Sequence, residues 1–382
     1  MVMPERTSPA MAGSTVQRDP ASLSPHEVPY RFQPAAMPTV ALEGSGDLPT
    51  GLPLDPSRQP VVQLLDPEGC RVVDDDFTWD GDVSMAVAAL RQLVLARRLD
   101  IEATLLQRQG ELGLWTPMLG QEAVQIGLQH ALIPADFIFP SYREHALASL
   151  RGVPVARLLG IFRGTEMGDW DAQDLGFANY CMVIGDQTLH ATGYAIASAL
   201  DWARDPAMPH GATVVFHGDG AMSEGDVSEA YLFAAARQAP VIFLCTNNQW
   251  AISEPNAVQT RVSPYQRAWG FGIPAVRVDG NDVLAMWAVS EWALARVRAG
   301  LGPVMIEAYT YRMGAHTTSD DPTKYRSQDL NDLWARHDPI KRLERWLRSL
   351  GQDVNQLAGE CAAGYFKLGT CKSPFNPGDL RH

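Results

Sequence analysis

The sequence has few cysteines, no long apolar segment and no concentration of basic residues. Its five cysteines are scattered, and none form a Cys-x-x-Cys pair, so we expect neither a structural zinc site nor a disulfide framework. No apolar run approaches the roughly 18 residues that a membrane-spanning helix requires. The net charge is −13 with no basic patch, which argues against nucleic-acid binding. A reducing, intracellular compartment is the default for such a chain.

The first 60 residues show neither a secretory signal nor a mitochondrial one. They lack a charged start followed by an apolar core, and they carry six acidic residues beside four arginines, whereas transit peptides are poor in acids. We therefore expect a cytoplasmic, bacterial protein. Residues 1–80 read as an extended, Pro-rich N-terminal arm, which is either disordered or wrapped around a partner subunit.

Residues 81–350 alternate apolar strands with amphipathic helices. Such alternation predicts an α/β fold, a parallel sheet with helices on both faces. A helix is expected over Val83–Arg108, a loop over 164–178, and an irregular tail over 351–382. The expected strands cover 137–139, 214–216, 241–246, 275–278 and 303–311.

Two of these strands form a predicted βαβ unit that carries hard oxygen ligands. Gly218-Asp219-Gly220 follows the first strand, and Asn248 follows the second, 29 positions after Asp219. Because neighbouring parallel strands end at one edge of a sheet, the two side chains should lie together. Carboxylate and amide oxygens suit Mg²⁺, which leaves positions for water and phosphate. The pattern indicates a magnesium-diphosphate clamp; the alternative is an ordinary crossover with a tight turn.

The backbone around Asp219 carries two further expectations. Gly218 and Gly220 should permit close backbone approach and unusual dihedral angles. A helix is expected over 223–237, and amides at its start would be ready to accept a phosphate.

Other polar residues follow strands and should reach the same edge. Tyr142 and Arg143 follow one strand, and Arg312 and His316 follow another. Arginine can hold a diphosphate with its planar fork, and a loop histidine suits proton transfer. The alternatives are a surface Arg143 paired with Glu144 and an incidental histidine. Their convergence with Asp219 favours the functional interpretation.

The motifs together resemble a known enzyme family over roughly residues 80–350. The matching segments are Tyr-Arg-Glu, Gly-Asp-Gly-Ala-x-Ser-Glu-Gly-Asp, Asn-Asn-Gln-Trp-Ala-Ile-Ser, Arg-Val-Asp-Gly-Asn-Asp and Thr-Tyr-Arg-x-Gly-x-His-x-Thr-Ser-Asp-Asp. They resemble the α subunit of the decarboxylating component of the 2-oxo acid dehydrogenase complexes. The resemblance is strongest to the branched-chain enzyme, which acts on 3-methyl-2-oxobutanoate.

The resemblance implies thiamine diphosphate and Mg²⁺ as cofactors. By this resemblance the metal ligands are Asp219, Asn248 and the carbonyl of Trp250, and the catalytic residues are His316 and Arg312, with Arg312 supporting the loop of His316. The residues implied to contact the cofactor are Tyr142, Arg143, Met182, Gly218, Gly220, Ala221 and His316.

The resemblance also implies partners. A β subunit would complete an α₂β₂ heterotetramer and supply the glutamate that activates the cofactor, so this chain alone should be inactive. The acyl group would pass to lipoyl groups of an acyltransferase component; neither nucleic acid nor membrane is an expected partner. Two alternatives stay open: a pyruvate or acetoin dehydrogenase α subunit, and a catalytically degenerate scaffold for β.

Overall fold

The computed structural model describes residues 61–355. The rest of the predicted arm and most of the predicted tail, residues 1–60 and 356–382, lie outside the described residues. The centre is a five-stranded sheet in the order β1-β2-β3-β7-β6, with every pair parallel. Its strands are β1 (Phe137–Phe139), β2 (Thr213–Gly218), β3 (Val241–Asn247), β6 (Ala275–Asp279) and β7 (Val304–Tyr309).

The central strands are apolar on both sides, as expected for a parallel sheet covered by helices. Successive side chains alternate between faces: in β3, Ile242 and Leu244 pack into one core, whereas Val241 and Phe243 pack into the other. The predicted α/β architecture, including neighbouring β2 and β3, is confirmed.

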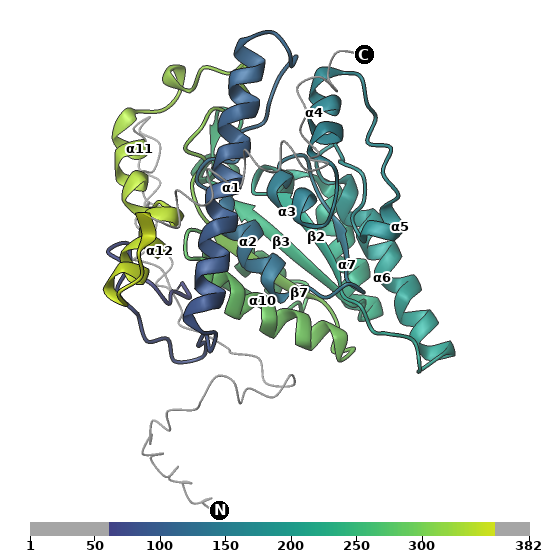
Figure 1. The fold of residues 1–382 in the computed structure, drawn as a ribbon. Helices are drawn as coiled ribbons and strands as arrows, with labels where there is room; N and C mark the ends of the chain where they lie inside the picture. The colour runs from purple at the N-terminus through teal and green to yellow at the C-terminus, as the bar shows by residue number, and fades with distance from the viewer. Residues whose placement is uncertain (1–60, 356–382) are drawn as a thin grey trace, which may run out of the picture.

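Helices cover both faces of this sheet (Figure 1). One core includes residues of α1 (Val83–Arg108), α2 (Glu122–Ala131), α3 (His145–Leu150) and α10 (Val283–Arg298). The opposite core includes residues of α6 (Asp186–Arg204), α7 (Gly225–Arg237) and α9 (Pro264–Trp269). The other helices are α4 (Val155–Arg163), α5 (Ala172–Leu175), α8 (Asn256–Gln259), α11 (Gln328–Trp334) and α12 (Pro339–Ser349), and the short strands β4 (Trp250–Ala251) and β5 (Glu254–Pro255) form a separate antiparallel pair.

One local prediction needs correction, and another is confirmed. The segment 164–178 is not wholly a loop, because Asp171 accepts hydrogen bonds from the amides of Gln173 and Asp174 and so caps the short helix α5. The helix predicted over 223–237 is confirmed as α7, and a 3-10 turn at Gly220–Ser223 precedes it. The backbone amides next to Asp219 therefore belong to the turn rather than to the start of a long helix.

The described part of the predicted arm packs against the domain. Val62 forms a parallel bridge with Val278 of β6. The amides of Leu64 and Leu65 donate to Asp282 Oδ2 at 2.7 and 2.6 Å, and both side chains are buried. Residues 62–65 thus anchor the chain at the start of α10. Among the helices of residues 61–355, none combines the length and apolar character needed to cross a bilayer.

Candidate active site at the carboxyl edge of the sheet

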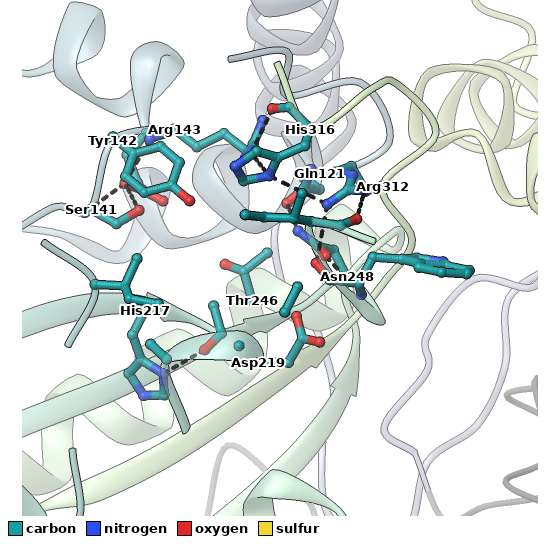
Figure 2. Close-up of a pocket in the computed structure, with 18 of the residues that line it drawn as sticks. Gln121, Ser141, Tyr142, Arg143, His217, Asp219, Thr246, Asn248, Arg312 and His316 are labelled. Atoms are coloured by element: carbon teal, nitrogen blue, oxygen red, sulfur yellow. Dashed lines mark hydrogen bonds between the residues drawn. The ribbon is translucent and has the colours of Figure 1, made fainter. Parts of the chain in front are cut away.

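Four adjacent strands deliver polar residues into one cavity (Figure 2). The turns after β1, β2, β3 and β7 supply most of its wall, and residues at or just before the starts of α2 and α6 supply the rest. Parallel α/β sheets bind ligands at this edge. The cavity is lined by Gln121, Ser141, Tyr142, Arg143, Glu144, Ile184, Gln187, His217, Gly218, Asp219, Gly220, Ala221, Thr246, Asn248, Trp250, Ala251, Ile252, Arg312 and His316.

Asp219 lies at the end of β2 and is 2 % exposed. Its Oδ2 accepts one hydrogen bond, at 3.3 Å, from the amide of Asn256. Burial raises the pKa of Asp219 to about 6, although its own backbone N–H, the Asn256 amide, Arg312 and the Asn248 backbone N–H all favour the ionised form. A bound cation would stabilise this buried carboxylate further, because the cation would replace its lost solvation.

Asn248 follows β3 and has a fixed amide orientation. The backbone N–H of Trp250 donates to Asn248 Oδ1 at 3.2 Å, and Asn248 Nδ2 donates to Gln121 Oε1 at 3.0 Å. The oxygen keeps a second lone pair. Asp219 and Asn248 thus form an oxygen-rich floor of the cavity, as the sequence predicts.

The turn after Asn248 is strained. Gln249 and Ile252 have φ angles of 70° and 56°, a region that residues other than glycine seldom occupy and that β-branched residues strongly disfavour. Arg312 stabilises the turn by donating to the carbonyls of Trp250, at 3.1 Å, and Ile252, at 2.6 Å. The Trp250 carbonyl, predicted as a third metal ligand, is therefore shared with Arg312 and keeps one lone pair for a metal.

Of the two glycines beside Asp219, only Gly220 is required for a close approach of the chain. A Cβ on Gly220 would lie 2.7 Å from the Cβ of Ala251, so only glycine allows this close approach. A Cβ on Gly218 would meet only the amide nitrogen of Gly220, at 4.0 Å, and would point into otherwise open space. Neither residue has a positive φ angle, so the expected unusual dihedral angles are wrong.

Arg143 and Tyr142 occupy the opposite side of the cavity. Arg143 is only 7 % exposed, so the alternative that placed it on the surface is wrong. Its guanidinium donates to the carbonyls of Pro117 and His316. Glu144 instead accepts from the amide of Ser141, at 2.8 Å, and from that of Arg143, at 3.3 Å. This buried carboxyl, whose pKa burial raises, fixes the turn that presents Tyr142 and Arg143.

His316 completes this cationic rim, defined here as Arg143, Arg312 and His316. Burial lowers the pKa of His316 to about 4, and the charges of Arg143 and Arg312 add to the effect. Both guanidinium groups approach His316 Nδ1, at 3.5 and 3.4 Å. Because arginine only donates, Nδ1 is the acceptor and the proton of the neutral ring is on Nε2. His316 is thus a neutral imidazole with one N–H available as a donor.

The loop of His316 is held by a hydrogen-bonded network. Asp320 accepts from the His316 amide at 2.8 Å and from the hydroxyl of Tyr325 at 2.5 Å. Arg312 donates to the same hydroxyl at 3.0 Å. Arg312 is fully buried and so joins the Trp250 turn to the His316 loop, in keeping with its predicted supporting role.

Most of the predicted site residues line this cavity together. Met182 is not among the lining residues: it is 52 % exposed, and Ile184 of the same segment lines the wall instead. Sequence reasoning missed Gln121 and Asn256, which contact Asn248 and Asp219. Both residues lie far in the sequence from the side chains they contact, Gln121 from Asn248 and Asn256 from Asp219. No local sequence pattern indicated these contacts.

The donor set fits a magnesium-diphosphate group. Among residues 61–355 there is no cluster of three or more His, Cys, Asp or Glu side chains able to hold a metal. Asp219, Asn248 and a backbone carbonyl would instead provide a partial set, and Mg²⁺ commonly completes such a set with water and phosphate oxygens. The rim arginines provide positive charge for an anionic ligand.

Comparisons with known proteins agree with this geometry. The dehydrogenase E1 component family matches residues 91–356. The 3-methyl-2-oxobutanoate dehydrogenase subunit alpha of Mycobacterium tuberculosis is 45 % identical over 305 residues, which are 79 % of this chain and 81 % of the relative. The chain belongs to the dehydrogenase E1 component family.

A second relative is named for a different substrate, pyruvate. The pyruvate dehydrogenase E1 component subunit alpha of Staphylococcus aureus is 36 % identical over 297 residues, which are 77 % of this chain and 78 % of the relative. The E1 family uses thiamine diphosphate, and an E1 α subunit works with a β subunit. The predicted family resemblance is confirmed.

Proposed function

We propose that this chain is the α subunit of a thiamine diphosphate- and Mg²⁺-dependent dehydrogenase for branched-chain 2-oxo acids, with 3-methyl-2-oxobutanoate as substrate. It would form an α₂β₂ heterotetramer and pass the acyl group to a lipoylated acyltransferase component. The observation that supports this best is the single cavity that joins the floor of Asp219 and Asn248 to the rim of Arg143, Arg312 and His316. The substrate assignment follows the relative that is 45 % identical.

The cavity's own residues have distinct tasks in this proposal. Asp219, Asn248 and the Trp250 carbonyl would hold Mg²⁺, and Arg143 would bind the anionic diphosphate. Bound thiamine diphosphate supplies the electron sink for decarboxylation. His316, a neutral imidazole with its proton on Nε2, would donate a hydrogen bond to an oxygen of the reacting group. Arg312 would hold the turn at Trp250 and the loop of His316 in fixed positions relative to each other.

The test is a reconstitution assay. This chain and its β subunit are purified separately, mixed with Mg²⁺ and thiamine diphosphate, and followed by reduction of an artificial electron acceptor. We expect activity only in the mixture, with the highest kcat/KM for 3-methyl-2-oxobutanoate. A higher kcat/KM for pyruvate would instead support the second candidate, a pyruvate dehydrogenase α subunit, for which the Staphylococcus aureus relative is the supporting observation.

The catalytically degenerate scaffold is the third outcome. Its signature would be a stable α–β assembly that binds thiamine diphosphate but turns over none of the 2-oxo acids. The presence of Asp219, Asn248 and His316 in one cavity argues against it. Failure of the assembled protein to bind the cofactor would contradict the proposal as a whole.

A further inference from the structure

Gln121, a residue of the cavity wall, carries a buried donor that has no hydrogen-bond partner. This residue precedes α2, is 2 % exposed and lines the cavity. Its amide nitrogen Nε2 is buried and has no hydrogen-bond partner. A buried donor without a partner destabilises the fold, so such a group at the wall of a cavity points to a ligand.

The orientation of the Gln121 amide follows from its neighbours. The backbone N–H of Trp250 can only donate, so the oxygen of Asn248 must face it. Asn248 then presents Nδ2 to Gln121, at 3.0 Å, and Gln121 must answer with its oxygen. Its Nε2 group is consequently turned away from Asn248. Figure 2 shows the two side chains joined by this bond beside the rim residue Arg312.

The backbone on either side of Gln121 is rigidly held. The backbone N–H of Gln121 donates to the carbonyl of Met118 at 2.9 Å. The carbonyl of Gly120 accepts from Thr310 Oγ1 at 2.7 Å and from Asn281 Nδ2 at 3.1 Å. A Cβ on Gly120 would lie 2.5 Å from the Tyr311 carbonyl, so only glycine fits there. The unpaired donor is therefore positioned before any ligand arrives, which is the arrangement expected of a binding group.

We propose that Gln121 is a diphosphate-binding residue: its Oε1 fixes the amide of the metal ligand Asn248, and its Nε2 donates to a diphosphate oxygen on the same metal. This inference rests on the proposed function. In the proposed site Asn248 and the diphosphate bind the same metal. A diphosphate oxygen would therefore lie close to Asn248 and to the Gln121 side chain that contacts it. Arg143 and Arg312 line the same cavity and favour an anion there.

Three variants separate the two roles of Gln121 in the assembled α–β protein. Gln121→Met removes both contacts. Gln121→Glu keeps an oxygen for Asn248 but replaces the donor with a negative charge. Gln129→Met changes a half-buried glutamine on α2 that does not line the cavity, and serves as the matched control. Binding of thiamine diphosphate with Mg²⁺ is measured by quenching of tryptophan fluorescence, and inorganic pyrophosphate is titrated as a competitor.

We expect Gln121→Met to weaken thiamine diphosphate binding by about 10- to 100-fold and Gln121→Glu by at least as much. Both should weaken pyrophosphate binding in parallel, and Gln129→Met should match the wild type. Wild-type affinity in Gln121→Glu would overturn the proposal, because it would leave Gln121 with only the orienting role. Unchanged pyrophosphate binding in both variants would place the contact elsewhere and overturn it as well.

Two further outcomes are separated by controls. If Gln121→Met fails to assemble, Gln121→Glu decides the question, since it retains the contact with Asn248. If the wild-type assembly itself binds no thiamine diphosphate, the proposed function fails, and this inference falls with it for that separate reason.

Discussion

The floor and the rim of the cavity are built in opposite ways. The floor residues Asp219 and Asn248 come directly from the ends of adjacent strands and present oxygen atoms. The cationic rim comes from turns and loops held by side chains that donate to carbonyl groups. A cation on the floor and an anion against the rim would complement each other, so the cavity suits a metal-diphosphate pair better than either ion alone.

The largest expected effect breaks the floor. Replacing Asp219 by alanine removes the only anionic metal ligand that we assign, so Mg²⁺-dependent binding of thiamine diphosphate should fall by roughly a thousandfold or more. The fold should persist, because the burial that raises the pKa of Asp219 also makes its carboxylate costly to retain without a metal. Calorimetric titration of the assembled protein measures the binding, and thermal unfolding measures the fold.

Asp201→Ala is the matched control for this variant. Asp201 lies on α6, its side chain is 49 % exposed, and it contacts Arg204 on the same helix. Its loss should leave both cofactor binding and unfolding nearly unchanged. Ordinary cofactor affinity in Asp219→Ala would refute the assignment of the floor as a metal site.

A smaller effect is expected when the rim is altered. His316→Ala removes the imidazole but keeps the backbone contacts with Asp320 and Arg143, so thiamine diphosphate binding should weaken by only a few-fold. Acyl transfer to a lipoyl group should fall by about a hundredfold, the scale of a lost hydrogen-bond donor at a reacting oxygen. Single-turnover acylation of a lipoyl domain, compared with cofactor titration, measures the two effects. Equal losses in both would contradict a separate catalytic role for His316.

The same comparison explains how far the sequence could predict the site. Asp219 and Asn248 were predictable because strand ends in a βαβ unit must meet at one edge. Gln121 and Asn256 were not, because their contacts with Asn248 and Asp219 depend on how separate segments pack. The α/β fold followed from the alternation of elements, whereas the 3-10 turn before α7 did not, since a four-residue element leaves no period to detect.

The smallest expected effect is on the pH dependence of stability, and it tests whether His316 of the rim is neutral in the folded protein. The pKa of His316 is about 4 in the folded protein, against an ordinary value of about 6.5 when the chain is unfolded. Between these values the unfolded state binds more protons, so His316 makes the fold progressively less stable as pH falls from 6.5 to 4. Above pH 6.5 it has no such effect.

The matched variant for this effect is His316→Gln, which keeps a polar amide in the rim but does not titrate. From pH 7 to 5 its free energy of unfolding should fall less steeply than that of the wild type, by up to about 1.4 kcal/mol per pH unit. Denaturant unfolding of the metal-free protein at several pH values measures the two slopes. Parallel slopes would show that His316 titrates normally in the fold, and that burial and the two arginines do not lower its pKa.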